Sequence, residues 1–122
     1  MPTLLLVDDD PLIRGSLGMV LELDGFTVLQ ATTGAEALAL LPKAEIDLVI
    51  TDFNMPEVNG LQLLTELKRR KPEVPVILVT GYGTVEQAVE AMKTGAFDYV
   101  SKPIMDDEMK LVIRRALDDK NL

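Results

Sequence analysis

Acidic residues follow two apolar runs of the sequence, at positions where carboxylates could do chemistry. Asp8, Asp9 and Asp10 come directly after the first run, and Asp52 comes directly after the third. The chain has no His and no Cys, which excludes catalysis by a His base and zinc sites built on imidazole or thiolate. The remaining chemistry uses carboxylates, Lys, hydroxyl groups and metals that bind oxygen.

Carboxylates at the ends of neighbouring strands would need a cation between them. Such strands are about 4.8 Å apart, and two carboxylates about 5 Å apart repel by roughly 3 kcal/mol at an effective dielectric near 20. Oxygen ligands of this kind suit Mg²⁺, which also takes phosphate oxygens. Lys102, after the fifth run, adds an internal positive charge. The set predicts phosphoryl chemistry in which an Asp can be the nucleophile and forms an acyl phosphate.

The elements that must position these residues are five short apolar runs, each followed by a stretch with apolar residues three and four apart. This spacing predicts a strand followed by a helix, five times over. The predicted strands are 4–7, 26–30, 47–51, 76–80 and 97–101. The predicted helices are 11–24, 34–42, 60–70, 84–94 and 106–118.

Residues that start and stop helices support these boundaries. Pro11 suits a first helical position, and Gly25 and Gly95 suit left-handed C-terminal caps. Gly15 and Gly18 count against the first helix, at about 1 kcal/mol each, but its apolar stripe remains. Two side-chain pairs match a capping box: Thr33 with Glu36, and Thr84 with Gln87.

The composition of the strands predicts their order in the sheet. The first, third and fourth are apolar throughout, as in strands covered on both faces, while the second and fifth mix polar and apolar positions and read as edges. With right-handed crossovers, the prediction is an α/β fold: a doubly wound, flavodoxin-like parallel sheet of order 2-1-3-4-5 with helices on both faces. Its binding crevice would lie at the carboxyl ends of strands one and three. Thr80 and Lys102 would end the fourth and fifth strands at the same edge.

Length and charge limit the classes of function. A chain of 122 residues predicts one domain over 1–122, with 118–122 the start of a linker or tail. The net charge of −8 disfavours direct binding to nucleic acid or anionic membranes. The apolar runs are far shorter than the ~20 residues of a membrane span, and no secretory signal pattern begins the sequence. We therefore expect a cytoplasmic protein.

Each candidate residue has an ordinary structural interpretation. An Asp run after a strand is usually turn and cap chemistry, and Asp10 before Pro11 is predicted to be a helix cap. Asp52 and Lys102 could be loop residues, and Thr80 an ordinary strand end. These interpretations do not predict that such residues converge from four strands on one edge of one sheet.

Four separated motifs carry a resemblance to a known family. They are LLLVDDD at 4–10, DLVITDFNMPEVNG at 47–60, VILVTG at 76–81 and GAFDYVSKP at 95–103. Over nearly its whole length the chain resembles the receiver (CheY-like) domain of two-component response regulators. The resemblance implies a signalling switch that catalyses its own phosphorylation and dephosphorylation, rather than a turnover enzyme.

The resemblance also implies roles for particular residues. Asp52 would be the phosphoacceptor. Asp9 would bind Mg²⁺ directly, Asp8 mostly through a metal-bound water, and Asn54 through its backbone carbonyl. Lys102 would pair with the phosphoryl group.

Further implied roles concern the change that follows phosphorylation. Thr80 would hydrogen-bond the transferred group, and Tyr99 would turn inward as Thr80 moves. A cis peptide would precede Pro103. The resemblance implies that bulky Tyr82 would lie near the path of the hydrolytic water, so we expect a phosphoryl lifetime longer than in the variant Tyr82→Ala.

The partners implied by the resemblance are a histidine kinase as phosphoryl donor and an effector domain or downstream protein. The change would appear on the surface of the fourth helix, fifth strand and fifth helix. A basic group on the fifth helix, Lys110 with Arg114 and Arg115, is either a solvated face or a surface for a partner or homodimer. The motif at 95–103 is similar to receivers that precede an ATPase in enhancer-binding transcription activators.

Two other classes compete with this interpretation. A phosphatase of the haloacid dehalogenase type would use Asp8 and Asp10, but the chain lacks the Thr that follows them in that family and has no room for a cap domain. Mutation of Asp8, rather than of Asp52, would then abolish labelling by acetyl phosphate. A flavin carrier of the same fold would need Gly, Ser and Thr donors in the first loop, and the acidic loop would repel its phosphate.

Overall fold

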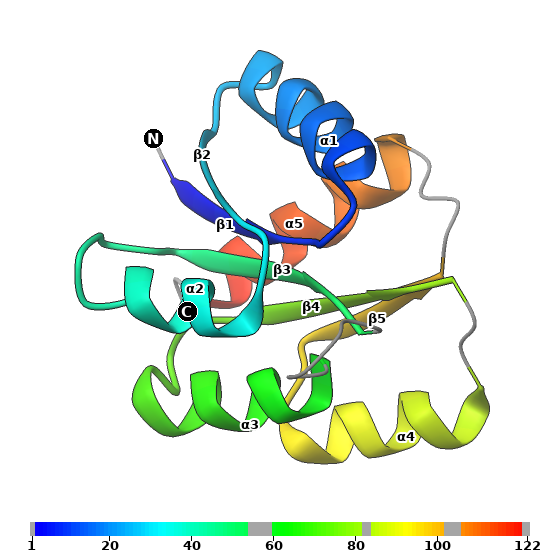
Figure 1. Ribbon diagram of the computed structural model, residues 1–122. Coiled ribbons are helices and arrows are strands. Elements are labelled where there is room, and N and C mark those ends of the chain that lie inside the picture. Colours follow the sequence, from blue (N-terminus) through cyan, green and yellow to red (C-terminus); the bar gives the residue numbers. More distant parts are fainter. Residues whose placement is uncertain (1, 54–59, 82–83, 102–105, 121–122) are drawn as a thin grey trace.

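The computed structural model describes residues 2–53, 60–81, 84–101 and 106–120 and shows the predicted alternation of strands and helices (Figure 1). The strands are β1 Thr3–Val7, β2 Thr27–Ala31, β3 Leu48–Asp52, β4 Val76–Thr80 and β5 Asp98–Ser101. The helices are α1 Pro11–Leu23, α2 Gly34–Leu40, α3 Gly60–Arg70, α4 Val85–Thr94 and α5 Asp106–Lys120. All strand pairs are parallel, in the order β2-β1-β3-β4-β5. The predicted fold class and strand order are confirmed.

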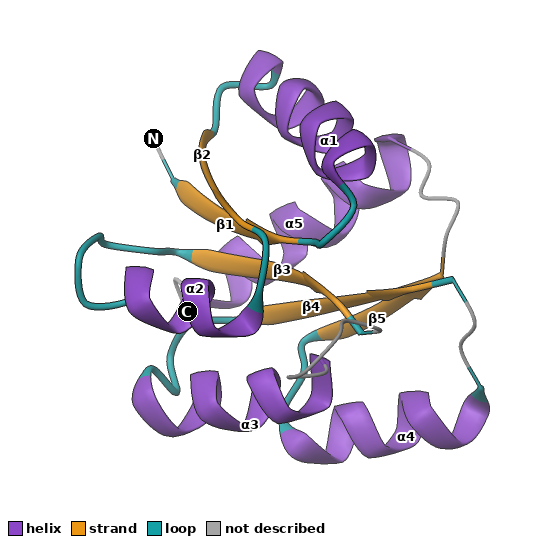
Figure 2. Ribbon diagram, in the orientation of Figure 1, coloured by secondary structure: helices purple, strands orange, loops and turns teal. Residues whose placement is uncertain are grey.

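The sheet is covered on both faces, α1 and α5 lying on one side and α2, α3 and α4 on the other (Figure 2). Successive side chains of a strand point to opposite faces, and β1 follows this rule. Leu4 and Leu6 pack in the core under α1 and α5. Leu5 and Val7 pack in the core under the other three helices. A strand buried on both faces must be apolar throughout, and this is why β1 could be recognised as central.

The difference between central and edge strands is visible in their exposure. Every residue of β3 and β4 is buried. In contrast, β2 and β5 each combine buried, half-buried and exposed positions. The central strands therefore supply the buried part of the carboxyl edge of the sheet, where Asp52 and Thr80 lie.

The helix ends use the residues that the sequence predicts. Asp10 is the N-cap of α1, and its carboxylate accepts the N–H groups of Leu12 and Ile13. The hydroxyls of Thr33 and Thr84 accept N–H groups at the starts of α2 and α4. Two glycines after helices have positive φ, 98° at Gly25 and 119° at Gly95, a conformation that residues with a Cβ adopt at a cost.

Small differences from the prediction concern the ends of elements. Helix α5 continues to Lys120, two residues beyond the predicted end at 118, so a tail could begin only after it. That 1–122 forms a single domain stays a prediction.

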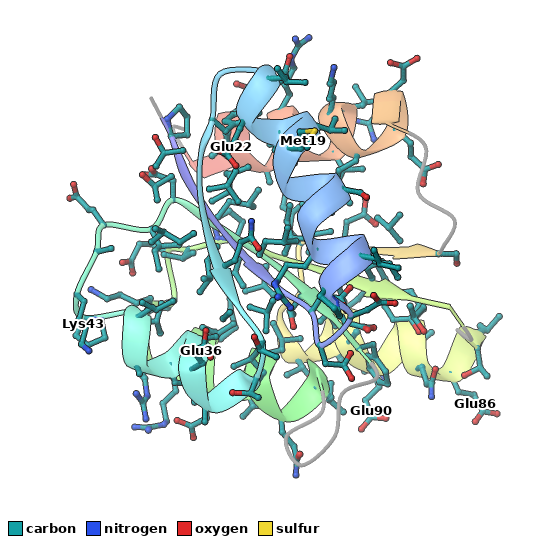
Figure 3. The ribbon with its side chains drawn as sticks, turned by 45° about the horizontal axis from the view of Figure 1, so that its top comes forward. Met19, Glu22, Glu36, Lys43, Glu86 and Glu90 are labelled. Atoms are coloured by element: carbon teal, nitrogen blue, oxygen red, sulfur yellow. The ribbon has the colours of Figure 1, made fainter. Side chains whose placement is uncertain are left out.

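Acidic side chains that contribute to the net charge, such as Glu36, Glu86 and Glu90, project outward from α2 and α4 (Figure 3). Among the described residues, no helix has the length and apolar character that crossing a membrane requires.

Candidate phosphorylation site

Three carboxylates meet at the carboxyl edge of the sheet. Asp8 follows β1, Asp52 ends β3, and the register pairs Val7 with Thr51, which brings the two acids onto neighbouring positions. Each of Asp8, Asp9 and Asp52 offers a ligand oxygen, and these oxygens lie within 4.8 Å of one another. Asp8 and Asp52 are 5% and 7% exposed, whereas Asp9 is exposed. The cluster is therefore open to solvent on the side of Asp9.

The third acid of the first loop has a different role. Asp10 caps α1 with its carboxylate, as its position before Pro11 predicts, and its backbone N–H donates to Asp8 Oδ1 at 2.9 Å. Capping thus separates the acidic run into two carboxylates for the cluster and one for the helix. Asp10 also helps to orient Asp8.

The predicted hydroxyl lies at the same edge of the sheet. Thr80 ends β4 and is fully buried, and the register pairs Asp52 with Val79, the residue before it. The other predicted site residues, Asn54, Tyr82, Lys102 and Pro103, lie outside the described residues.

Tyr99, the predicted switch residue, is half-buried on β5. Its ring meets the ring of Phe53 edge-on, with centroids 5.9 Å apart and planes at 77°. Its hydroxyl donates to Gln87 Oε1 on α4 at 3.3 Å. Because Phe53 directly follows Asp52 in the chain, these contacts connect the end of β3 to the first turn of α4.

The backbone that follows Asp52 is closely held. Phe53 donates its N–H to the carbonyl of Val79 at 2.7 Å, and Gly60 donates its N–H to the carbonyl of Phe53 at 2.7 Å. A Cβ on Gly60 would lie 2.5 Å from Phe53 Cα and 2.8 Å from the carbonyl oxygen of Asp52. The start of α3 can approach the end of β3 this closely because residue 60 has no side chain.

Arg14 and Gln30 belong to the surroundings of the site but are not among the residues predicted from the sequence. The guanidinium of Arg14 donates through Nη1 to the carbonyl of Asp8 at 2.8 Å and through Nε to Gln30 Oε1 at 3.1 Å. The sequence contained a signal for their proximity to the site. Arg14 lies in the helix that follows the acidic loop, and Gln30 lies near the end of β2, the strand beside β1.

The residues present fit a hard divalent cation. Among the residues that the structure describes, the cluster is made of carboxylate oxygens, which are ligands of Mg²⁺ and Ca²⁺ rather than of metals that prefer imidazole or thiolate. Mg²⁺ is usually held by one or two carboxylates and keeps several waters. A small cluster with one exposed member suits that mode of binding.

Comparison with known proteins identifies the family. The family model described as the response regulator receiver domain matches residues 4–114. The chain belongs to this family, whose members act as phosphorylation-dependent signalling switches and not as turnover enzymes. The predicted resemblance is thereby confirmed.

Individual relatives agree with this assignment. The chain is 43% identical over 114 residues to the regulatory protein AtoC of Escherichia coli, covering 93% of this chain and 25% of AtoC. A receiver domain structure from Clostridium thermocellum is 36% identical with a TM-score of 0.95, covering 99% of this chain and 98% of that one. The beryllofluoride-activated NtrC4 receiver domain dimer is 32% identical with a TM-score of 0.94, covering 98% of this chain and 99% of that one. The chain thus spans about a quarter of the length of AtoC and nearly all of the two receiver structures.

Proposed function

We propose that this chain is a switch that accepts a phosphoryl group on Asp52 in a Mg²⁺-dependent reaction. The observation that supports this most is the meeting of Asp8, Asp9 and Asp52 within 4.8 Å in a chain of the receiver family. Structural carboxylates in a turn have no need to gather in this way, because their mutual repulsion is unfavourable without a cation.

The proposed reaction is a transfer to the side chain of Asp52. A carboxylate oxygen of Asp52 attacks the phosphorus of the donor, forming an acyl phosphate bond as the bond to the donor nitrogen or oxygen breaks. The leaving group keeps that electron pair: the imidazole of a phosphohistidine donor takes up a proton, and the acetate of acetyl phosphate leaves as the anion. Bound Mg²⁺ would neutralise charge on the transferring group.

The other residues hold the metal or the product. Asp8 and Asp9 would hold Mg²⁺ together with Asp52 and the carbonyl of Asn54. Lys102 would neutralise charge on the phosphoryl group. The hydroxyl of Thr80 would donate a hydrogen bond to it.

The proposed consequence is a change in the α4-β5-α5 surface. The hydrogen bond between Tyr99 and Gln87 couples β5 to α4, so movement of Thr80 and Tyr99 toward the phosphoryl group would alter both elements. On α5, Lys110 lies 3.7 Å from Asp24 at the end of α1, while Arg114 and Arg115 are exposed. The two arginines therefore remain candidates for contact with a partner.

The proposed partners follow from the family and the relatives. A histidine kinase would be the phosphoryl donor and an effector domain or separate protein the target, in the cytoplasm. One relative is described as a transcriptional regulatory protein, GlrR of Escherichia coli, of which the chain covers 26%; this supports a role in controlling transcription within a longer regulator. The NtrC4 receiver structure is a dimer, which supports homodimerisation on phosphorylation.

The haloacid dehalogenase alternative is disfavoured by the position of Asp10. That chemistry needs both Asp8 and Asp10 to face the substrate, but the carboxylate of Asp10 accepts the first N–H groups of α1. An acid in this position serves the helix.

Mass spectrometry tests the proposal. We expect the chain, incubated with acetyl phosphate and Mg²⁺, to gain the mass of one phosphoryl group, and the variant Asp52→Asn to gain none. A matched control is Asp47→Asn, at the opposite edge of the sheet, where the carboxylate accepts the N–H of Thr3 at 2.8 Å and an amide oxygen can do the same. Equal labelling of Asp52→Asn and the parent chain would refute the proposal.

A further inference from the structure

We infer that Arg14, held in place by Gln30, is a positioning residue for the metal pocket. It fixes the peptide plane between Asp8 and Asp9, and through that plane the directions of both carboxylates. The inference rests on the proposed function, because it concerns how these two acids receive Mg²⁺.

The main chain at Asp8 is held on several sides. Its N–H donates to the carbonyl of Ala31 at 3.1 Å, and its carbonyl accepts from Arg14 Nη1 at 2.8 Å. Its carboxylate accepts the N–H of Asp10 at 2.9 Å. Since the carbonyl of Asp8 belongs to the peptide unit that also contains the nitrogen of Asp9, the contact with Arg14 orients both acids.

The side chain of Arg14 is itself held at a second point. Its Nε donates to Gln30 Oε1 at 3.1 Å, so two donors of one planar guanidinium have partners on different elements, the β1–α1 loop and β2. Because the guanidinium group is a rigid plane, the hydrogen bond at Nε also fixes the position of Nη1.

Gly18 explains why Gln30 can take its position. A Cβ on Gly18 would lie 2.9 Å from Gln30 Nε2, whereas a Cβ on Gly15, one turn earlier, would meet no atom within 4 Å. The two glycines look equally unfavourable in the sequence of this helix. In the structure, Gly18 makes room for the side chain that holds Arg14, and Gly15 has no such contact.

This contrast provides a test that leaves every acid and Arg14 itself unchanged. In Gly18→Ala, the new methyl group would lie 2.9 Å from Gln30 Nε2, so the amide must shift, and we expect its contact with Arg14 to weaken. We expect the Kd for Mg²⁺, measured by calorimetry on the whole chain, to rise about tenfold, the lower end of the effect typical of residues that orient a metal ligand. Gly15→Ala, the matched control, is expected to bind Mg²⁺ as the parent does.

Two further variants separate positioning from general stability. Gln30→Ala should weaken Mg²⁺ binding as much as Gly18→Ala does, and the double variant should be no weaker than either single variant, because both remove the same contact. Arg14→Lys keeps the positive charge but not the fork of donors, and it should also weaken binding. The amide ¹⁵N shift of Asp9 should change in all of them before Mg²⁺ is added.

The outcomes distinguish this inference from the proposed function. If the parent binds Mg²⁺ and Gly18→Ala and Arg14→Lys bind it equally well, the inference is wrong and the proposed function stands. Additive losses in the double variant would also overturn it. If the parent takes up neither Mg²⁺ nor a phosphoryl group, the proposed function itself fails.

Discussion

The two halves of the carboxyl edge of the sheet are held very differently. On the side of β1 and α1, Asp8 is fixed through its peptide N–H, its carbonyl and its carboxylate, with a guanidinium donor at 2.8 Å. On the side of β4 and β5, Tyr99 contacts its neighbours through a hydrogen bond of 3.3 Å and an edge-on ring contact. We propose that the first half keeps one geometry and that the second half exchanges between two.

Energies support this division. A hydrogen bond from a charged donor contributes about 1.5–3 kcal/mol and one between neutral groups about 1 kcal/mol. An edge-on aromatic pair adds about 0.5–1.5 kcal/mol. A ligand shifts a two-state equilibrium by its differential affinity for the two states. A phosphoryl group on Asp52 could therefore overcome the contacts of Tyr99 while the pocket of Asp8 keeps its form.

The largest effect is expected at Gly60, where the start of α3 packs against the end of β3, between the two halves. In Gly60→Ala the added methyl group would overlap backbone atoms of Asp52 and Phe53, and these cannot move aside as a side chain could. Overpacking of this kind costs typically 1–3 kcal/mol or more. We expect the free energy of unfolding in urea to fall by about 3 kcal/mol.

Gly15→Ala is again the control for Gly60→Ala, because the site of its methyl group is open. It should raise stability by up to about 1 kcal/mol, since Ala is the better helix former. Equal stability of the two alanine variants would show that α3 does not depend on close approach to β3.

A smaller effect is expected in the other half from Tyr99→Phe. The variant keeps the ring that meets Phe53 but loses the hydroxyl that donates to Gln87. A loss of about 1 kcal/mol would shift a two-state population roughly fivefold. NMR of the unphosphorylated chain should show amide shifts of α4 and β5 moving toward their values in the phosphorylated parent.

Gln87→Ala should produce the same shifts as Tyr99→Phe, since it removes the other partner of the bond. Amide shifts in α4 that stay at their parent values in both variants would mean that the contact does not hold the switch.

The smallest effect is expected at Lys68. This residue lies at the edge of the sheet opposite to the carboxylate cluster, so it serves as a control for both halves. Its Nζ donates to the carbonyls of Pro72 and Val74 at 2.9 and 3.1 Å. Desolvation lowers its pKa below the ordinary value of 10.5, an effect that Glu73 partly offsets. The unfolded chain therefore binds more protons in the window just below pH 10.5, and stability rises with pH there.

Urea unfolding of Lys68→Met and the parent at several pH values measures this contribution. The parent should gain stability relative to the variant as the pH rises toward 10.5, and Mg²⁺ binding should be the same in both. If the parent instead lost stability relative to Lys68→Met as the pH rises, that result would contradict the lowered pKa of Lys68.

Most of the fold could be predicted from the sequence because it depends on local patterns. Strands covered on both faces must be apolar, which identified β1, β3 and β4, and caps such as Asp10 and Gly95 act within a few residues. The convergence of Asp8 and Asp52 followed from the strand order. Each of these inferences needs only the period of the sequence or the topology of the sheet.

The contacts that hold the site could not be predicted in this way. Gly15 and Gly18 carry the same helix penalty in the sequence, but in the structure Gly18 is buried against Gln30 and Leu6, whereas Gly15 is exposed. Likewise, Gln87 matched a capping box, yet its side chain accepts from Tyr99. These pairs depend on rotamers and on distances between elements, which periodicity does not determine.

The most direct test is a crystal structure of the chain soaked in Mg²⁺ and beryllium fluoride. We predict density for a fluoroberyllate bonded to a carboxylate oxygen of Asp52, and for a metal ion between it and Asp8 and Asp9, with the main chain of Asp8 unmoved. An empty pocket, or an adduct on another acid, would contradict the proposed phosphorylation of Asp52.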